Sequence, residues 1–506
     1  MGEVTVTGGA EFNISFLLFL LLLLLIPLFV FFLGHIKLSL WKASTLPPGP
    51  YPWPVIGNIL DMGKKPHISL AHFAKIHGPV ISLRLGTQLL VVGSSPAAAA
   101  EILKTHDALL SARHVPQVSP MKDPKLNHLS LAWAFTCSKQ WKLLRNLCRA
   151  ELFSSKAIES QVNLREKKVK EMLCFLGRKE GKIVKIGEVV LAAVFNILGN
   201  LFLSKDLVSL DDETSNEGIK GLIWRLMELA TTPNLADFYP ILDWLDIQGL
   251  RKTTLETIGK LQDIWEGLIE ERRVSNDYGV RRPQDFLDVL IGHGFQDNQI
   301  SNLLLELFLA GTETTSTTVE WAMVELLKNQ EAMKKLNEEL ARKMNGNDIR
   351  EFDLPQLSYL SVCIKETLRL HPPTPFLLPH KALETCTVMN YTIPKDSQIF
   401  VNLWAIGRDP EVWDDPLAFK PERFMNSELD FKGNDFEFTP FGAGRRICPG
   451  LSMGSKQLHL ILASLFHSFE WYLSDDTDPM QLDTKEKFGL TLQKEQPLLL
   501  IPKSKV

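Results

Sequence analysis

The sequence has little net charge and no pairing pattern among its cysteines. Its 506 residues carry a net charge of −4, so there is no basic excess of the kind that binding to nucleic-acid phosphates requires. The six cysteines are scattered, with no CxxC pair and no zinc-type spacing. In a chain of this length, such scatter is typical of reduced thiols that face the cytosol rather than of a disulfide framework.

Charge is also missing from residues 14–33, an apolar run long enough to cross the hydrocarbon core of a bilayer. A cleavable signal peptide is the alternative. It is disfavoured because the run is too long, because Glu3 and Glu11 precede it in place of basic residues, and because no small-residue cleavage site follows. Lys37 and Lys42 follow the run, so the positive-inside rule places the body of the protein in the cytosol. The sequence therefore predicts a single-pass membrane anchor.

The remainder of the chain predicts one large, mainly α-helical domain with small β-sheets. We expect a short lumenal N-terminus at 1–13, the anchor at 14–33, a basic and proline-rich linker at 34–54, and the folded domain at 55–506. Alternating apolar residues around Gly86 predict a hairpin within Val80–Val92. Helical patterns cover Ala98–Thr105, Ile219–Ala230, Thr254–Val274, Ser301–Leu327 and Leu357–Leu370.

A glycine-rich segment, Phe441–Gly450, surrounds Cys448. Its glycines, Gly442 among them, allow the backbone to turn sharply and to pass close to a flat cofactor. The apolar helical pattern that follows would place a helix N-terminus beside Cys448, which favours a thiolate and a lowered thiol pKa. Arg446 is suited to pair with a carboxylate of that cofactor.

This segment resembles the heme-binding loop of the cytochrome P450 family, in which Phe441, Gly444, Arg446, Cys448 and Gly450 occupy the family's motif positions. The resemblance extends over nearly the whole chain and implies the P450 fold, with heme b bound by Cys448 as the iron ligand. It further implies two sets of residues: heme contacts from Phe441, Gly442, Arg446, Trp141, Arg145 and His380, and a buried structural network of Glu366, Arg369 and Arg423. Many relatives carry arginine where this chain has His380, which leaves the charge at that position open.

The helical pattern over Ser301–Leu327 has a weak centre, because glycine and several threonines are poor helix formers. We expect a local distortion there. The centre resembles the acid–alcohol pair that the family places over the heme. By this resemblance Gly311 leaves space for dioxygen, Thr314 donates a hydrogen bond to bound oxygen, and Glu313 supports proton delivery.

The resemblance implies a heme-thiolate monooxygenase of the plant microsomal type, in the endoplasmic reticulum membrane. Such enzymes use dioxygen and electrons that a flavoprotein reductase takes from NADPH. The group that the chain is most similar to contains geraniol hydroxylases and benzylisoquinoline-alkaloid hydroxylases and phenol-coupling enzymes. We expect an alkaloid substrate, with a terpenoid as the alternative. By family position, the apolar substrate pocket includes Phe376, Leu377, Leu378 and Phe488.

Two other classes of function fit the sequence less well. A heme-thiolate isomerase or dehydratase would need no dioxygen, but such relatives usually lack the acid–threonine pair that Glu313 and Thr314 provide. A non-enzymatic anchored protein would explain residues 14–33, but it would leave the segment around Cys448 without a role.

Overall fold

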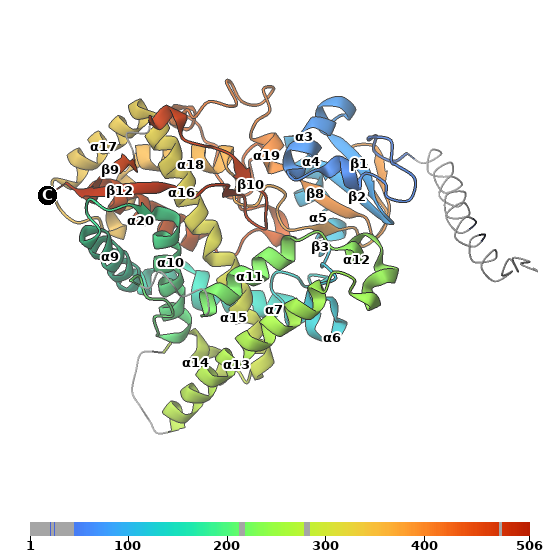
Figure 1. Cartoon of the computed structure of the whole chain (residues 1–506), viewed down its shortest axis with the longest axis horizontal. Coiled ribbons are helices and arrows are strands. Elements are labelled where there is room, and N and C mark those ends of the chain that lie inside the picture. Colours follow the sequence, from blue (N-terminus) through green and yellow to red (C-terminus); the bar gives the residue numbers. More distant parts are fainter. Residues whose placement is uncertain are drawn as a thin grey trace, which may run out of the picture.

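The computed structural model describes residues 45–211, 218–277, 284–474 and 478–505, together with Leu21 and Leu25. Apart from those two leucines, the predicted anchor lies outside the described residues, as does residue range 34–44 of the predicted linker. The described part is mostly helical, with the sheet of β1 (Val80–Leu85), β2 (Gln88–Gly93) and β8 (Gln398–Val401) at one end and the sheet of β9 (Phe469–Leu473) and β12 (Leu499–Ser504) at the other (Figure 1).

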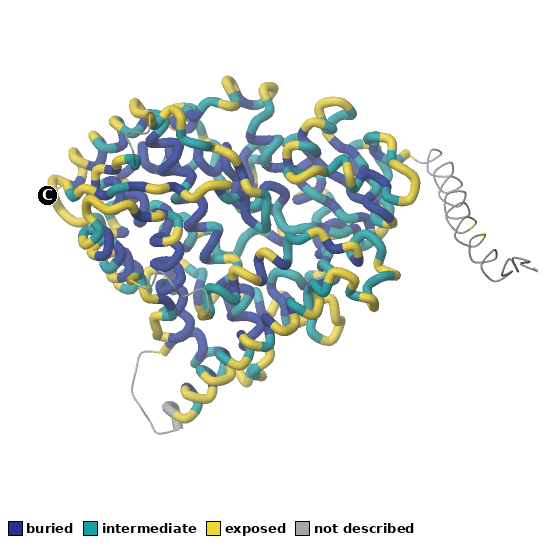
Figure 2. Tube along the Cα trace, in the orientation of Figure 1, coloured by how far each residue is buried: buried dark blue, intermediate teal, exposed yellow. Residues whose placement is uncertain are grey.

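The core forms around α16 (Glu313–Lys328), which passes through the middle of the molecule (Figure 1). It packs against α10 (Ile186–Leu203), α18 (Ser358–Leu370) and α20 (Leu451–Ser468). Trp321 of α16 is fully buried among apolar residues of these helices. Figure 2 shows the buried segments gathered at the centre and the exposed ones at the rim. This packing fixes the helices that carry the predicted site residues.

Among the described residues, α10 is the one helix with the length and mean hydropathy of a membrane span. Most of it is buried inside the protein, from Ile186 to Leu203. A helix that is apolar on every side and covered by other helices belongs to the core of a large domain. We therefore assign α10 to the core.

The remaining helices surround these four. They are α2 (Ile59–Met62), α3 (Pro66–His77), α4 (Pro96–Ala100), α5 (Asp107–Leu110), α6 (Pro124–Asn127), α7 (Lys139–Cys148), α8 (Ser155–Ser160), α9 (Val162–Arg178), α11 (Ile219–Thr231), α12 (Leu235–Phe238), α13 (Leu250–Asp277), α14 (Phe286–Gly292), α15 (Asp297–Gly311), α17 (Gln330–Met344) and α19 (Leu403–Ile406).

The main sheet has five strands in the order β1-β2-β8-β5-β3. They are β1 (Val80–Leu85), β2 (Gln88–Gly93), β8 (Gln398–Val401), β5 (His380–Lys381) and β3 (Ala112–Arg113). The other strands are β4 (Val184–Lys185), β12 (Leu499–Ser504) and β9 (Phe469–Leu473) in one sheet, and the pairs β6 (Cys386–Val388) with β7 (Tyr391–Ile393) and β10 (Glu486–Lys487) with β11 (Gln493–Lys494). Antiparallel pairing of β3 with β5 places Arg113 opposite His380.

The predicted hairpin and all five predicted helices are present, with two local differences. The first predicted helix consists of α4 followed by a π-helical turn at Glu101–Thr105. The pattern over Ser301–Leu327 forms two helices, because α15 ends at Gly311 and α16 begins at Glu313. The expected distortion is therefore confirmed, and Thr312 lies at the break.

Candidate active site

Cys448 lies just before α20, in a loop whose shape depends on its glycines. The N–H of Cys448 donates to the carbonyl of Phe441 over 2.9 Å. Gly442 and Gly444 have φ angles of 71° and 63°, which other residues rarely adopt. A Cβ atom on Gly444 would lie 2.0 Å from the carbonyl oxygen of Leu103. The loop can therefore approach its neighbours only with glycine at that position.

The start of the following helix lowers the thiol pKa as expected, but the net shift for the free thiol is upward. Burial raises the pKa of Cys448, and it outweighs the opposite effects of the Gly450 and Leu451 N–H groups and of Arg145. A bound metal ion reverses this balance because it deprotonates the thiol that coordinates it. The protein contributes hydrogen bonds from the N–H groups of Gly450 and Leu451, and a bound heme iron would supply the charge that favours the thiolate.

Cys448 and the break between α15 and α16 line the same cavity, which we call the Cys448 cavity. Gly311 and Thr314 line it on the side of the break, while Phe441 and Cys448 line it on the side of the loop. Leu307, Leu368 and Met453 give it a largely apolar surface. The structure thus brings the predicted iron ligand together with two of the three predicted oxygen-activating residues, Gly311 and Thr314.

Three arginines gather beside the loop, together with Trp141 and with His380, whose low pKa makes it neutral. The guanidinium groups of Arg446 and Arg145 lie 4.6 Å and 5.3 Å from the ring of Trp141. Arg113 and His380 sit opposite each other on β3 and β5. All their hydrogen bonds in the described part of the chain go to main-chain carbonyl groups, and no described carboxylate forms an ion pair with these arginines.

This group is short of negative charge. Burial and the neighbouring Arg446 lower the pKa of Arg113 to about 9, and burial together with Arg113 lowers the pKa of His380 to about 3. Nη1 of Arg446 is buried without a hydrogen-bond partner among the described residues. Buried cations require an anionic partner. The two propionates of heme b are such anions, so the residues present fit this cofactor.

Arg113 is a member of this group that the sequence did not reveal. It is buried, and its Nη1 donates to the carbonyl of Leu378 over 2.8 Å. It belongs to no motif, and it joins the group only because β3 pairs with β5, about 270 residues away in the chain. The place of Arg113 in this group is visible only in the structure, because the pairing of two distant strands leaves no local pattern in the sequence.

The predicted charged network is compact and buried. Arg369 donates from Nε and Nη2 to the two carboxylate oxygens of Glu366 over 2.7 Å and 2.8 Å. Nε of Arg423 donates to Glu366 over 3.0 Å. The side chains of Glu366 and Arg369 are completely buried. The three charges join α18 to the chain segment that leads toward the Cys448 loop.

At the break, threonine hydroxyl groups bond back to earlier carbonyl groups. Thr312 Oγ1 donates to Phe308, Thr314 Oγ1 to Ala310, and Thr315 Oγ1 to Gly311, over 2.8, 2.8 and 3.1 Å. Such bonds loosen a helix. A Cβ atom on Gly311 would lie 2.8 Å from Leu198 Cδ1, so glycine also permits the packing of α10 against α15.

Glu313 points away from the Cys448 cavity, toward the turn between β10 and β11. Its carboxylate accepts hydrogen bonds from Thr491 Oγ1, from Gln493 Nε2, and from Trp224 Nε1 at 3.2 Å. With Phe488 these residues line a second cavity, the α11 cavity. Burial raises the pKa of Glu313 and outweighs the opposing effects of these hydrogen bonds and of the charge on Lys487. Glu313 and Thr314 therefore border two different cavities on either side of one turn.

The residues predicted for the substrate pocket are spread over these surroundings. Phe376 is buried, and its ring centroid lies 4.7 Å from that of Phe400 and 5.8 Å from that of Phe488. Leu377 lies beside Gly442, since a Cβ atom on Gly442 would be 3.6 Å from Cδ1 of Leu377. The carbonyl oxygen of Leu378 accepts a hydrogen bond from Arg113. Contact of these four residues with substrate remains a prediction.

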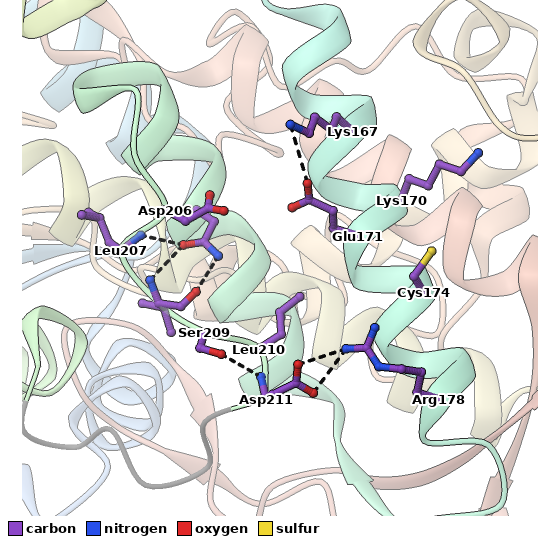
Figure 3. Close-up of a pocket in the computed structure, with 12 residues that line it drawn as sticks. Lys167, Lys170, Glu171, Cys174, Arg178, Asp206, Leu207, Ser209, Leu210 and Asp211 are labelled. Carbon is purple, nitrogen blue, oxygen red and sulfur yellow. Dashed lines mark hydrogen bonds and ion pairs between the residues drawn. The ribbon is translucent and has the colours of Figure 1, made fainter.

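A wide surface pocket lies between α9 and the segment after α10 (Figure 3). Its charged side chains are already paired: Arg178 lies 3.1 Å from Asp211, and Lys167 lies 3.9 Å from Glu171. None of the predicted site residues lines it. The chemistry of the chain is therefore centred on the Cys448 cavity.

Comparison with known proteins agrees with this geometry. A model of the family described as cytochrome P450 matches residues 47–501. The chain is 50% identical to a probable (S)-N-methylcoclaurine 3'-hydroxylase, isozyme 2, of Coptis japonica over 479 residues, which cover 94% of this chain and 96% of that protein. It is 45% identical to the corytuberine synthase of Coptis japonica over 94% of this chain and 97% of that protein. Identity to the geraniol 8-hydroxylase of Catharanthus roseus is 43%, over 91% of this chain and 94% of that protein.

Proposed function

The chain belongs to the cytochrome P450 family, and from that premise we propose that it hydroxylates an alkaloid of the benzylisoquinoline class. As a family member it is a monooxygenase that binds heme b and receives electrons from NADPH through a reductase. The observation that carries the substrate class is the 50% identity to an N-methylcoclaurine hydroxylase along almost the full length of both chains. The largely apolar wall of the Cys448 cavity suits an aromatic substrate.

We assign a separate role to each group of site residues. Cys448 would hold the iron, and Arg113, Arg145 and Arg446 would hold the propionates, with His380 and Trp141 packed beside them; Nε1 of Trp141 donates to the carbonyl of Leu131 over 2.8 Å. When bound, heme b supplies the chemistry that splits dioxygen, with one atom entering the substrate and the other leaving as water. Burial raises the pKa of Glu313, which favours its protonated form, and we propose that its proton reaches the Cys448 cavity through the adjacent Thr314, whose side chain lines that cavity.

Spectral titration of the ferric enzyme tests the substrate class. We expect N-methylcoclaurine to give a saturable change in the spin state of the heme, and geraniol to give none at the same concentration. A shift with geraniol alone would assign the enzyme to terpenoid oxidation instead.

Oxidative phenol coupling is the second candidate reaction, and the 45% identity to a corytuberine synthase favours it. The two reactions differ in the mass of the product. Hydroxylation adds one oxygen atom to the substrate, whereas coupling removes two hydrogen atoms and adds no oxygen. Mass spectrometry of the product from a reconstituted reaction distinguishes them.

Glu313→Gln tests the proposed proton donor. Because burial raises the pKa of Glu313, the group keeps its proton to a higher pH than an exposed glutamate, and donation should fall as the pH rises through that pKa. We expect Glu313→Gln to form product about 100-fold more slowly than wild type. The variant should also lack the decline at alkaline pH, because glutamine does not titrate. The pH profile of product formed per NADPH consumed measures both.

Glu320→Gln is the matched control. Glu320 also lies on α16, and burial also raises its pKa, but it accepts a hydrogen bond from the N–H of Leu498 and lines neither cavity. Equal losses in the two variants would contradict a special role for Glu313.

We propose that the protein is a single-pass protein of the endoplasmic reticulum membrane, with the catalytic domain in the cytosol. Exposed apolar side chains near the described N-terminal end support this orientation, since Trp53 and Leu60 are 60% and 72% exposed. Tyr239 Oη donates to the carbonyl of Val55 over 3.1 Å, which brings the segment after α12 next to them. That segment exposes Trp244 at 78%. Together these side chains form an apolar surface suited to lipid.

The double variant Trp53→Ser, Trp244→Ser should weaken the binding of a chain that lacks residues 1–44 to phospholipid vesicles. Each Trp→Ser change removes about 2 kcal/mol of binding free energy that comes from apolar burial in lipid. We therefore expect the affinity for vesicles to fall at least tenfold. Vesicle co-sedimentation measures it. The control Phe352→Ser, Leu417→Ser changes side chains that are 73% and 75% exposed, and it should bind normally. Equal loss in the control would contradict the assigned surface.

A further inference from the structure

A buried cluster around Glu486 takes no part in the chemistry described above. Glu486, in β10, accepts hydrogen bonds from His67 Nε2 over 2.9 Å and from Trp404 Nε1 over 3.1 Å, and Arg408 Nη2 lies 3.5 Å away. His67 is completely buried, and Glu486 is 7% exposed. Burial opposes the charge of Glu486, but hydrogen bonds from His371 and His67 and the charge of Arg408 hold its pKa far below the usual range. The cluster fixes the position of the His67 ring from α3.

The same ring contacts a residue of the predicted substrate pocket. His67 stacks on Phe488, with ring centroids 5.6 Å apart and an angle of 17° between the rings. The other neighbour of Phe488 is Phe376, whose ring meets it edge-on at 5.8 Å. Phe488 is half-buried and lines the α11 cavity with Glu313. His67 thus lies behind a cavity wall without belonging to it.

The turn that carries Phe488 is held at both ends. Before Phe488 the chain is fixed through Glu486, and after it Thr491 and Gln493 donate hydrogen bonds to Glu313. Between these points the side chain of Phe488 packs against an apolar cluster that includes Phe376, and His67 is the other aromatic ring in contact with it. The flat face of His67 constrains the ring plane of Phe488, because stacked aromatic rings prefer defined relative orientations.

We propose that His67 is a positioning residue for Phe488, and that this ring pair determines which atom of the bound substrate is oxidised. The inference rests on the proposed function, because it requires the bound substrate to extend from the Cys448 cavity into the α11 cavity, whose wall Phe488 helps to form. His67 acts through Phe488 and does not touch the substrate. Its hydrogen bond to Glu486 sets the angle of the ring, and the ring sets the angle of Phe488.

Two variants of His67 separate this role from a purely structural one. His67→Phe keeps a ring under Phe488 but removes a hydrogen bond from the buried Glu486, so it should lower the thermal midpoint. His67→Gln keeps a donor for Glu486 but removes the ring. We expect His67→Gln to change the ratio of oxidised regioisomers, and His67→Phe to keep the wild-type ratio despite its lower stability.

A ligand that does not depend on the natural substrate gives a second readout. Phenylimidazole binds heme iron through its imidazole nitrogen and reports the shape of the pocket by its phenyl group. We expect its spectral dissociation constant to rise about threefold to tenfold in His67→Gln and to stay near wild type in His67→Phe. If the enzyme oxidises no alkaloid, the proposed function fails, but this readout still decides the role of His67.

Three further variants complete the test. Phe488→Leu should reproduce the effects of His67→Gln, and the double variant His67→Gln, Phe488→Leu should add little to either, because both remove one ring contact. His72→Gln changes an exposed histidine of the same helix and should match wild type. Additive effects in the double variant, or equal regioisomer changes in His67→Phe and His67→Gln, would overturn the proposal.

Discussion

Cys448→Ala is expected to abolish product formation and to remove the carbon monoxide difference band that is characteristic of thiolate-bound heme. The reason is geometric, because Cys448 is the one cysteine that lines the cavity with Gly311 and Thr314 in the described part of the chain. Its loss leaves no sulfur on that wall to hold the iron or to donate electron density for cleavage of the O–O bond. Heme content, measured against protein, and the difference spectrum report the loss directly.

Cys174→Ala is the matched control. Cys174 is exposed and lines the surface pocket beside α9 (Figure 3). We expect this variant to keep the full heme content, spectrum and turnover. A Cys448→Ala protein with an unchanged difference spectrum would show that another residue holds the iron.

Glu366→Gln should destabilise the protein more than any surface substitution. The change removes the negative charge that two buried arginines share, Arg369 at 2.7 Å and Arg423 at 3.0 Å. Breaking a buried ion pair in this way costs about 3–5 kcal/mol, because the partner charges remain buried without compensation. We expect a large fall in the thermal midpoint and poor retention of heme, since the network joins α18 to the segment before the Cys448 loop.

An exposed ion pair provides the comparison. Arg178 and Asp211 lie 3.1 Å apart, and both side chains are more than half exposed. Arg178→Ala should change the free energy of unfolding by about 0.5 kcal/mol or less, because solvent screens such pairs. If Glu366→Gln were no more harmful than Arg178→Ala, the structural role of the network would be wrong. Denaturant titration of the heme-bound proteins measures both.

Local patterns in the sequence were enough to predict one hairpin and five helical segments, which the structure contains. The hairpin around Gly86 follows from alternating apolar residues, and Gly86 has the positive φ of 59° that its turn needs. The break after Gly311 follows from weak helix formers, and threonine hydroxyl groups take up the carbonyl groups there. These features depend on neighbours in the chain, so the sequence contains the information.

Features that depend on distant contacts were not predictable. Arg113 joins the other two arginines beside the Cys448 loop only through pairing of β3 with β5. His67 reaches Glu486 from the other end of the chain. Glu313 belongs to a recognisable motif, but its hydrogen bonds to Thr491 and Gln493 depend on where the β10–β11 turn packs. Motifs identify residue types, and the tertiary structure decides which side chains meet.

The pKa of Cys448 also depends on one local feature, which the sequence shows, and on one tertiary feature, which it does not. The sequence identifies the N–H groups at the start of α20, which do lower the pKa of the thiol. It does not show how deeply the sulfur is buried, and burial raises the pKa by more. The direction of the net shift therefore required the structure.

The most direct test of the whole account is turnover under isotopically labelled dioxygen. The enzyme in membranes would be combined with an NADPH-dependent reductase and given N-methylcoclaurine or geraniol in parallel. We predict that the alkaloid gains one labelled oxygen atom, that the reaction requires NADPH, and that geraniol is recovered unchanged. Labelled product from geraniol alone, or alkaloid product formed without NADPH and dioxygen, would contradict the account.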